Sequence, residues 1–482
     1  MCKEPGPSSS RSDGKENRFF SLGEHTGLRL KHFGSVIYRK KLFDFRELNH
    51  FATLLCRLLQ EQASTVQGLA GCLGDIYKRP EEELARDIQD FLNSLPPGYL
   101  RVTLQPPTEE GELGYEDVQK LMDELEKSWE ELPEQLFYSA PLQFHWEITK
   151  QCNLSCLHCY ASAQATKEGK VDTLDWEKCL ELLDTLAKMG VAQINFLGGE
   201  PLIEERFLEL LEETVSRGMD ITFPSNGTLL DQATLDRLWT LGMRYLTISL
   251  DSHDPQTFEK IRGRKGVFET VTDTIQRARE KGFDVIVNAV LTKLNSQHFP
   301  RLIELLLKLE VKVLKVIDEF PVGRGMANLE SLSLSPQEYQ DFYNFMLGEI
   351  EPRYRDRLDI RLNPRFTFLG KEGKKNKATE ASAIDYRCSA GRSQCFCSAE
   401  GDIYPCYLFY GEKEFLAGNI FKHPFDEIWK DEKSFSYFRE LAGSVPDCEP
   451  CPFVGNCKGG CRGEVYKLTG DFFAKNPFCW QP

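Results

Sequence analysis

Three cysteines in the stretch WEITKQCNLSCLHCYAS, residues 146–162, are the side chains in this chain best suited to carry out chemistry. Cys152, Cys156 and Cys159 have the spacing C-x3-C-x2-C and follow an apolar, strand-like run. Three thiolates on one short loop can bind three irons of an iron–sulfur cluster and leave one iron open for a ligand. A structural zinc site is the alternative, but it needs a fourth ligand, and only His158 is close in the sequence. The spacing therefore favours a cluster with an open iron.

A second motif follows about forty residues later, where the strand-like run QINFL ends in Gly198-Gly199-Glu200-Pro201. Glycines let backbone approach a ligand closely, and a carboxylate suits an ammonium group. Alone, such a motif would be only a turn. After a strand, and downstream of three cysteines, it indicates a ligand site beside the cluster.

These motifs, with Tyr160 directly after the last cysteine, resemble the radical S-adenosylmethionine (SAM) superfamily. The resemblance implies that the open iron of a 4Fe–4S cluster binds the amino and carboxylate groups of SAM, and that Gly198 to Pro201 contact that amino group. It also implies that the reduced cluster cleaves SAM to methionine and a 5'-deoxyadenosyl radical, which removes hydrogen from a substrate. A low-potential electron donor such as flavodoxin or ferredoxin is then an expected partner.

The order of strands and helices indicates a parallel sheet with helices outside it. Six strand–helix units suit an open, partial (β/α)6 barrel, which is an α/β fold whose ligands lie at the carboxyl ends of the strands. The expected strands are 142–149, 192–197, 220–224, 244–250, 284–292 and 311–318. The expected helices are 175–189, 203–217, 231–241, 266–281 and 298–309.

Polar residues at the later strand ends extend the expected SAM site. The motifs PSNGT and SLDS resemble the family's sugar and carboxylate contacts, and the arginine of KIRGRKGVF resembles one that reaches the SAM carboxylate. Each motif alone is also ordinary turn chemistry. The predicted contacts in this group are Ser225, Asn226, Ser249, Asp251, Arg262 and Asn288, with Thr228 beside them.

Length and composition exclude several classes of protein. The 482 residues exceed one typical domain, and the formal charge of −15 argues against a general nucleic-acid binder. No run of about eighteen apolar residues could span a membrane, and the polar opening residues 1–18 have no signal-peptide core. We therefore expect a cytoplasmic protein with a disordered N-terminal tail, whose sixteen cysteines are metal ligands or reactive thiols rather than disulfides.

Residues 19–95 have the pattern of a small separate domain. LRLKHFGSVIYRKK alternates like a strand or hairpin, and FRELNHFATLLCRLLQ, VQGLAGCLGDIY and EEELARDIQDFLNSL have apolar residues at helical spacing. This composition predicts a winged helix-turn-helix. The stretch resembles the peptide-recognition element fused to peptide-modifying enzymes, similar to the small chaperone of pyrroloquinoline quinone biosynthesis. Such an element would hold the leader of a precursor peptide as an added strand. DNA binding or a spacer role is the alternative.

The last hundred residues contain a second set of cysteines. Their order, C-x12-G-x4-C followed by C-x2-C-x5-C-x3-C and a final cysteine, resembles the SPASM extension of radical SAM enzymes. The resemblance implies two auxiliary 4Fe–4S clusters. One would be held by Cys448, Cys451, Cys457 and Cys479, and the other by Cys388, Cys406 and Cys461.

The fourth ligand of the second auxiliary cluster stays open at this point. Cys395 and Cys397 are two residues apart, so they share one face of a strand, and either could bind. We predict that neither is an obligatory ligand, because an open iron could bind a substrate thiolate.

The expected domain order is a tail (1–18), a recognition domain (19–95), a linker with a helix at Tyr115–Glu131 (96–135), the partial barrel (136–325), a connecting region (326–383) and the SPASM domain (384–482). Together these domains imply an enzyme, a radical SAM peptide maturase. The expected reaction is a thioether or carbon–carbon crosslink in a ribosomally made peptide, with the thioether favoured. The peptide, the linked residues, the general base and the oligomeric state do not follow from the sequence.

Three other functions are alternatives to peptide crosslinking. Sulfatase-maturing oxidation uses an aspartate after the cysteine of the G-x4-C step, but Tyr407 follows Cys406 here. Peptide epimerisation is a further radical reaction of such enzymes. A zinc-containing regulator that binds DNA through the winged helix is the alternative from another class of protein.

Overall fold

The computed structural model describes residues 19–22, 26–31, 34–39, 44–61, 64–95, 100–103, 115–131, 138–165, 174–362, 388–431, 433–439, 445–451, 457 and 459–480. The chain divides into two compact units. One contains residues 1–135 and 379–383, and the other contains residues 136–378 and 384–482. The predicted disordered tail, residues 1–18, and the charged segment 371–382 lie outside the described residues.

The N-terminal unit contains an antiparallel sheet with the order β2 (Thr26–Lys31), β3 (Gly34–Arg39) and β4 (Asp44–Leu48). The hairpin predicted for LRLKHFGSVIYRKK is confirmed, because β2 and β3 pair along their whole length. The helix predicted to begin at FREL was wrong. These residues form β4, because their pairing with β3 is a long-range interaction that helical periodicity cannot reveal. A second strand pair, β1 (Phe19–Leu22) and β5 (Leu100–Thr103), is also antiparallel.

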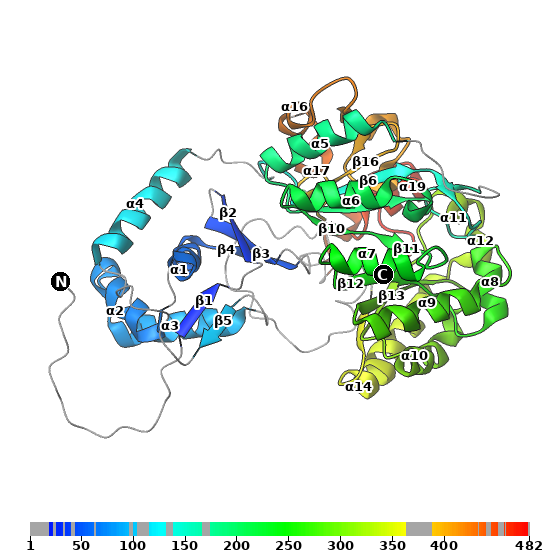
Figure 1. Cartoon of the computed structure of the whole chain (residues 1–482), viewed down its shortest axis with the longest axis horizontal. Helices are drawn as coiled ribbons and strands as arrows, with labels where there is room; N and C mark the ends of the chain where they lie inside the picture. Colours follow the sequence, from blue (N-terminus) through cyan, green and yellow to red (C-terminus); the bar gives the residue numbers. More distant parts are fainter. Residues whose placement is uncertain are drawn as a thin grey trace. The chain divides into compact units, whose positions relative to one another are not determined.

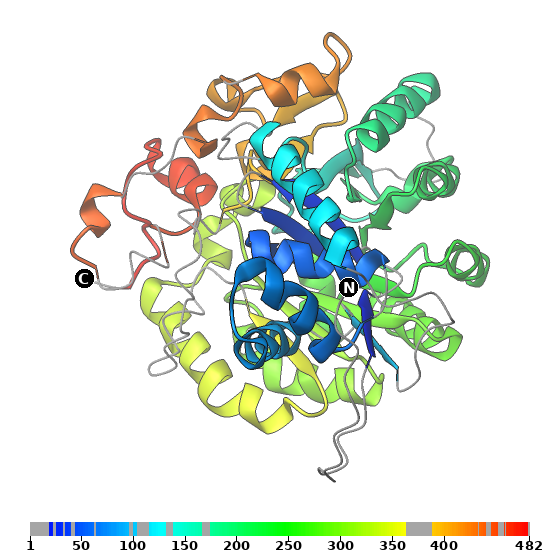
Figure 2. The ribbon, with the colours of Figure 1, turned by 90° about the vertical axis from the view of Figure 1, so that its left-hand side faces the viewer.

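Four helices complete this unit: α1 (His50–Glu61), α2 (Val66–Tyr77), α3 (Glu81–Ser94) and α4 (Tyr115–Glu131), drawn in blue to cyan in Figure 2. Helix α2 begins at Thr65, whose side chain accepts from the Gly68 amide, and it ends at Lys78 in the left-handed conformation. Leucines of α1, α2 and α3 form one apolar core with Val118 and Leu125 of α4. The helix predicted as a linker element therefore belongs to the core of this unit.

The second unit begins with a sheet of the order β10-β9-β6-β16-β17-β18. The strands β6 (Gln143–Thr149), β9 (Gln193–Gly198) and β10 (Asp220–Thr222) are parallel. β16 (Gln394–Cys397), from the cysteine-rich tail, pairs in parallel with β6. β17 (Asp402–Tyr404) and β18 (Gly418–Asn419) continue the sheet in antiparallel pairing. The tail thus extends the same sheet that carries the first cysteine motif.

A second, fully parallel sheet follows with the order β11 (Pro224–Ser225), β12 (Tyr245–Ser249), β13 (Asp284–Leu291), β14 (Val313–Asp318) and β15 (Asp359–Leu362). The single strand predicted at 220–224 was wrong. It is interrupted at Phe223, so that β10 pairs with β9 in the first sheet and β11 pairs with β12 in the second. The other predicted strands are present within two residues of their expected bounds.

Helices cover the outside of both sheets. α5 (Trp176–Lys188), α6 (Phe207–Ser216), α7 (Gln232–Thr240), α9 (Phe268–Lys281) and α10 (Phe299–Lys308) form an arc outside the strands, in green in Figures 1 and 2. The predicted α/β architecture is confirmed. Helix α6 starts later than expected, because Pro201–Ile203 form a 3-10 turn before it. Helix α8 (Pro255–Arg262) was not predicted. It begins at Asp254, whose carboxylate accepts from the Thr257 amide, and it ends at Gly263.

The segment after β14 consists of short helices: α11 (Gly323–Ala327), α12 (Leu329–Leu332), α13 (Pro336–Phe345), a π-helical turn (Met346–Ile350) and α14 (Glu351–Tyr354). Helix α13 has a complete capping box between Ser335 and Glu338.

The tail adds α16 (Phe425–Lys430), α17 (Ser436–Arg439) and α19 (Arg462–Thr469) around an aromatic cluster, which we define as Phe396, Tyr404, Phe409, Phe415, Phe438 and Phe472. Within the described part of the chain, no helix is both long and apolar enough to cross a membrane.

Candidate functional site

The loop of Cys152, Cys156 and Cys159 starts where β6 ends and contains the short strands β7 (Gln151–Cys152) and β8 (Gln164–Ala165). Backbone amides point at two of its sulfurs: Leu154 N–H at Cys152 Sγ and Ala163 N–H at Cys159 Sγ, each at 3.4 Å. Arg262 Nη1 lies 3.8 Å from Cys156 Sγ. Donors aimed at three neighbouring sulfurs stabilise thiolates, which is the form that binds iron.

Helix α11 holds the outer side of this loop. The Arg324 guanidinium donates to the carbonyls of Cys156 (2.8 Å) and Ala163 (2.7 Å), and its backbone amide donates to Cys159 O at 2.9 Å. The amide of Asn328 adds a bond to Leu157 O at 3.1 Å. The loop has no regular structure between β7 and β8, so these contacts satisfy carbonyls that would otherwise lack partners.

Gly198 and Gly199 allow the second motif to pack directly against the cysteine loop. A β-carbon on Gly199 would lie 2.1 Å from Gln151 O, and one on Gly198 would lie 2.5 Å from Thr149 O. The Gly199 and Glu200 amides donate to these same two carbonyls, at 2.9 and 3.0 Å. We expected the glycines to admit a ligand. In the structure they admit the backbone of the cysteine loop, which fixes the two motifs relative to each other.

Glu200 is 1% exposed and joins the third predicted motif. Its carboxylate accepts from Ser225 Oγ at 2.9 Å and from the Asn226 amide at 2.8 Å. Burial raises the pKa of Glu200 to about 7, against the opposing effect of these hydrogen bonds. A buried carboxylate at the carboxyl ends of β9 and β11 is suited to receive an ammonium group.

Asn153 connects the cysteine loop to the same motif. Asn226 Nδ2 donates to Asn153 Oδ1 at 2.8 Å, and Asn153 Nδ2 donates to Thr228 Oγ1 at 2.7 Å. Asn226 Nδ2 also approaches Cys152 Sγ at 4.0 Å. The structure thus brings the cysteine loop, Glu200 and the PSNGT turn into one network.

Asp251 and Arg262, both predicted SAM contacts, form a buried ion pair at 2.7 Å. Asp251 also accepts from the Val290 amide at 2.9 Å, and Arg262 reaches Cys156 as described above. Ser249 and Asn288 are directly opposite each other on β12 and β13. Pro201 is buried at the start of the 3-10 turn after Glu200.

Tyr160 lies between the cysteine loop and the tail. Its ring centroid is 5.0 Å from that of Tyr407, the residue after Cys406. Burial, and then the charge of Glu147, raise the pKa of Tyr160 well above its ordinary value. This tilted ring contact places the segment around Cys406 against the cysteine loop.

Several tail cysteines lie close enough to influence one another's pKa, whereas their division into two cluster-binding sets stays a prediction. Burial and then the neighbouring Cys461 raise the pKa of Cys388 to about 12, and the pKa of Cys406 responds to both of these thiols. The pKa of Cys448 is raised by burial, then by Cys479, with a smaller effect of Cys451. The pKa of Cys457 responds to burial and then to Cys479 and Cys448. Each predicted set therefore contains thiols that lie close to one another.

Cys395 and Cys397 lie on the face of β16 that is opposite to the face of Phe396. They are fully buried in the large apolar core that also contains Cys179 of α5, whereas Cys388 and Cys406 pack against the aromatic cluster of the tail. Phe396, between them, belongs to that aromatic cluster. The sheet therefore separates these two cysteines from Cys388 and Cys406.

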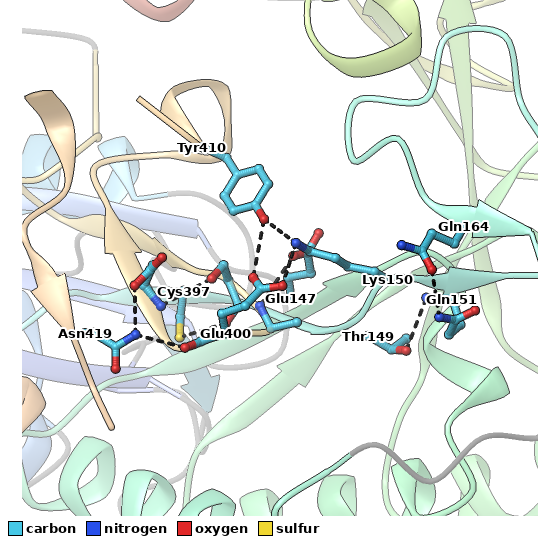
Figure 3. A network of polar contacts seen from close by, with 12 residues as sticks. Glu147, Thr149, Lys150, Gln151, Gln164, Cys397, Glu400, Tyr410 and Asn419 are labelled. Carbon is cyan, nitrogen blue, oxygen red and sulfur yellow. Dashed lines mark hydrogen bonds and ion pairs between the residues drawn. The ribbon is translucent and has the colours of Figure 1, made fainter. Parts of the chain in front are cut away.

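A polar contact that the sequence did not reveal joins the cysteine loop to the tail (Figure 3). Lys150 Nζ pairs with Glu400 Oε1 at 2.6 Å and donates to the Tyr410 hydroxyl, which itself donates to Glu400 at 3.3 Å. Glu147, 1% exposed, accepts from the Ala399 amide at 3.4 Å, and burial raises its pKa to about 7. Lys150 precedes Cys152 and Tyr410 follows Cys406, so this bridge ties the two cysteine-bearing loops together.

The donor sets fit iron–sulfur clusters better than single ions. Among the described residues, no three His, Cys, Asp or Glu side chains converge on a single-ion site. A four-iron cluster offers each thiolate its own iron, so its ligands need not meet at one point. The loop cysteines and the tail cysteines are suited to hold such clusters, and polar residues at the strand ends approach two of the loop sulfurs.

Comparison with known proteins shows which protein families this chain resembles. Residues 146–306 match the Radical SAM superfamily, and residues 388–457 match SPASM, an iron–sulfur cluster-binding domain. The chain is 29% identical over 349 residues to the AdoMet-dependent heme synthase of Methanosarcina barkeri, with 71% of this chain and 97% of that protein covered. It is 28% identical over 344 residues to the mycofactocin maturase MftC of Mycobacterium tuberculosis, covering 71% and 83%.

Crystal structures of SuiB from Streptococcus suis, bound to S-adenosylmethionine or to the precursor peptide SuiA, share the fold of this chain. Each has a TM-score of 0.67 at 18% sequence identity, covering 96% of this chain and 99% of that one. At this identity the likeness concerns the fold alone.

The chain therefore carries a radical SAM domain and a SPASM domain, and it is an enzyme with radical SAM chemistry. The radical SAM domain binds a 4Fe–4S cluster and SAM, and the SPASM domain holds auxiliary iron–sulfur clusters. When bound, the first cluster and SAM supply a 5'-deoxyadenosyl radical.

Several residues of this site could not be found from motifs. Asn153 lies inside the cysteine motif, but at a position the motif leaves free. Arg324 and Asn328 come from a segment without helical periodicity, and only the glycine pair of Gly323-Arg324-Gly325 marked a turn there. Lys150 is 260 positions from Tyr410 in the sequence, and Glu400 is close to Tyr410. No pattern in a single sequence links residues so far apart.

Proposed function

We propose that the protein is a peptide maturase that forms a crosslink in a ribosomally made precursor peptide. The observation that carries this proposal is the N-terminal unit. The heme synthase and MftC each match 71% of the chain, whereas the SuiB fold, seen with its precursor peptide, covers 96%. A radical SAM enzyme that acted only on a small molecule would have no need of an additional unit with its own core.

The N-terminal unit offers a place for a leader peptide. In the described residues, β2 and β4 pair only with β3, so each has an unpaired edge to which an extended peptide could add. The three-stranded sheet together with helices α1, α2 and α3 supports a winged helix-turn-helix of the kind that recognises peptides, to which α4 adds a fourth helix. A regulatory DNA-binding role is disfavoured by the acidic charge of −15.

The residues of the strand ends would hold SAM. Glu200 would pair with its ammonium group, and Asn226 and Ser225 orient Glu200 by hydrogen bonds. Asn288 has a buried Oδ1 without a hydrogen-bond partner in the described structure, which suits a SAM hydroxyl. The three loop cysteines would hold the first cluster, and Arg262 would neutralise charge beside Cys156.

A thioether is the crosslink we favour. Cys388, Cys406 and Cys461 are a set of three, and Cys395 and Cys397 face the opposite side of the sheet. This arrangement supports an auxiliary cluster with an iron free to bind a peptide thiolate, which metal coordination keeps deprotonated and in place. A carbon–carbon crosslink remains the alternative, with the auxiliary clusters serving to remove an electron.

Sulfatase-maturing oxidation is less well supported. The position after Cys406 is Tyr407, whose ring contacts that of Tyr160, so a phenol stands where that reaction requires a carboxylate. A low-potential electron donor and a cytoplasmic location complete the proposal.

The test pairs the anaerobically reconstituted enzyme with short peptides encoded beside its gene. We expect one peptide to lose a pair of hydrogen atoms per crosslink in a SAM-dependent reaction, as read by mass spectrometry. A control enzyme without residues 1–135 should cleave SAM but modify this peptide at least about tenfold less, and should bind its leader weakly. The cut is placed after α4 because Val118 and Leu125 belong to the N-terminal core.

Full leader binding by the truncated enzyme would contradict the role of the N-terminal unit. A porphyrin substrate, tested in parallel because of the heme synthase similarity, should remain unchanged. Conversion of the porphyrin with no peptide modified would replace the proposed function.

A further inference from the structure

Two cations, Lys315 and Arg361, lie on neighbouring strands of the second sheet. On β13 and β14, Val285, Val287 and Ala289, together with Leu314 and Val316, are fully buried and belong to the core formed with α9 and α10. The alternate residues of these strands are only partly buried and so face away from the helices, into the barrel. Lys315 is one of these interior residues, between Val313 and Ile317 on its own strand.

The register of the sheet aligns Lys315 with other polar residues. Ser249 is opposite Asn288, Asn288 is opposite Lys315, and Lys315 is opposite Arg361. Neighbouring strands are about 4.8 Å apart, so side chains on one face of such a row touch or nearly touch. The row begins with two predicted SAM contacts and ends with two cations, the second on β15, the last strand of this sheet.

The positive charge of Lys315 is not balanced by the described protein. Arg361 pairs with Asp359 at 2.7 Å, and both of these side chains are about half exposed. Lys315 itself makes no ion pair within the described ranges. Burial, and then the charge of Arg361, lower the pKa of Lys315, and the more distant Asp359 opposes this effect only in part. A partly buried ammonium between apolar neighbours and beside an arginine costs free energy, and the nearby Asp359 carboxylate offsets only part of this cost.

We infer that Lys315 and Arg361 form a binding site for a carboxylate of the substrate, adjacent to SAM inside the barrel. This inference rests on the proposed function, because it assigns the carboxylate to the peptide. An arginine offers a planar, two-pronged donor and a lysine a point charge, and the two together are suited to one carboxylate. An acidic side chain or the C-terminal carboxylate of the peptide could supply it.

SAM also has a carboxylate, and the position of Arg262 separates the two sources. Arg262 lies against Cys156 of the cluster loop, whereas Lys315 and Arg361 are on the last two strands of the other sheet. The carboxylate of SAM is expected next to the cluster, so the cations of β14 and β15 remain for the other reactant.

The first experiment uses the full-length holoenzyme and the precursor peptide that passes the test of the proposed function. The variants are Lys315→Met and Arg361→Met, with Lys312→Met as the matched control, because Lys312 is exposed and lies directly before the same strand. Loss of a charge-assisted contact should raise the KM for the peptide about tenfold or more in the first two variants. Lys315→Arg should recover part of the loss, and Lys312→Met should behave as wild type.

The source of the carboxylate is read from the peptide. Replacing its acidic residues one at a time with the corresponding amides, and separately amidating its C-terminus, should reproduce the effect at one position in the wild-type enzyme. The same peptide change should have little further effect in Lys315→Met, as a double-mutant cycle requires of two groups in contact. If Lys315→Met instead raises the KM for SAM, measured without peptide, the carboxylate is that of SAM and the inference is overturned. Unchanged kinetics for both reactants would overturn it as well.

A second measurement does not depend on the identity of the peptide. Acetylation of Lys315 in the holoenzyme is followed by mass spectrometry in the presence of N-acetyl-L-glutamate amide or of N-acetyl-L-glutamine amide. The carboxylate probe should slow acetylation of Lys315 severalfold without affecting Lys312, and the neutral probe should slow acetylation of neither lysine. Equal acetylation with both probes would overturn the site, even if a peptide substrate is found. Protection without any peptide substrate would support the anion site while the proposed function fails.

Discussion

The cysteine loop after β6 and the cysteines of the tail are both predicted to hold iron–sulfur clusters, but the chain supplies their sulfurs in different ways. The loop supplies its three cysteines from eight consecutive residues, and the side chains of Arg324 and Asn328, from the segment after β14, hold its backbone. In the tail, Cys388, Cys406 and Cys461 come from three separate places in the sequence, and Cys388 and Cys406 pack against the aromatic cluster.

This difference predicts different consequences of damage. A contiguous ligand set can be emptied without unfolding its surroundings, because its ligands hold the metal but not the fold. A dispersed set depends on tertiary packing, so it can be lost through residues that never touch iron. The experiments below test this contrast in order of decreasing expected effect.

The largest effect is expected from replacing Cys152, Cys156 and Cys159 together with alanine. SAM cleavage should be abolished while the auxiliary clusters remain, because the two cysteine sets are separate. Iron content should fall by about a third if three clusters contribute equally. The measurements are 5'-deoxyadenosine formation and iron per chain. Persistent 5'-deoxyadenosine formation would show that these cysteines do not hold the catalytic cluster.

The converse experiment is Phe409→Ala in the tail. Phe409 is fully buried, and its ring centroid is 4.2 Å from that of Phe415 and 5.3 Å from that of Phe438. Its truncation should cost about 3–5 kcal/mol of local stability and release auxiliary iron, although Phe409 binds none. SAM cleavage without peptide should persist, in contrast to the triple cysteine variant. Retention of all iron would mean that the tail cysteines position themselves without the aromatic cluster.

Gly199→Ala should show how strongly the barrel loop depends on its backbone contacts. The added β-carbon would lie 2.1 Å from Gln151 O and 2.9 Å from Cys152 Cβ, so the backbone must move. We expect a loss of about 1–3 kcal/mol and a weakened first cluster, with the auxiliary clusters unaffected. Gly218→Ala is the control, because nothing lies near the added β-carbon at Gly218, although its φ of +79° would strain an alanine. Equal iron loss in both variants would show that the loss does not come from the contact with the cysteine loop.

Much of the barrel could be predicted because its signals are local. Alternation of apolar runs placed the strands and helices, and the motif residues at strand ends were expected to meet, as Glu200, Ser225 and Asn226 do. The contacts that are absent from any motif could not be predicted. FREL formed a strand because of its partner β3, and the strand at 220–224 divided because its two ends pair with different sheets.

The tail shows the same limit more clearly. Its cysteine order indicated two clusters, but it could not show that β16 pairs with β6 of the barrel. That pairing turns the side chains of Cys395 and Cys397 toward the apolar core, so that they do not reach the aromatic cluster on the other face of the sheet. A spacing of two residues established only that they share a face.

The smallest effect on iron is therefore expected from Cys395→Ser and Cys397→Ser. Both thiols are buried in the apolar core, where burial raises their pKa values well above the ordinary range, so they are neutral there. A hydroxyl in place of either thiol should cost about 1–3 kcal/mol of stability without removing iron, because the aromatic face of the sheet is unchanged. Cys179→Ser is the matched control, since Cys179 lies in the same core on α5 and belongs to no ligand set.

Cys461→Ser should lose auxiliary iron in the same assay. If Cys395→Ser or Cys397→Ser lost iron as Cys461→Ser does, while Cys179→Ser did not, the auxiliary cluster would be fully protein-ligated. Its role would then be to carry electrons, and a carbon–carbon crosslink would become the better account of the reaction.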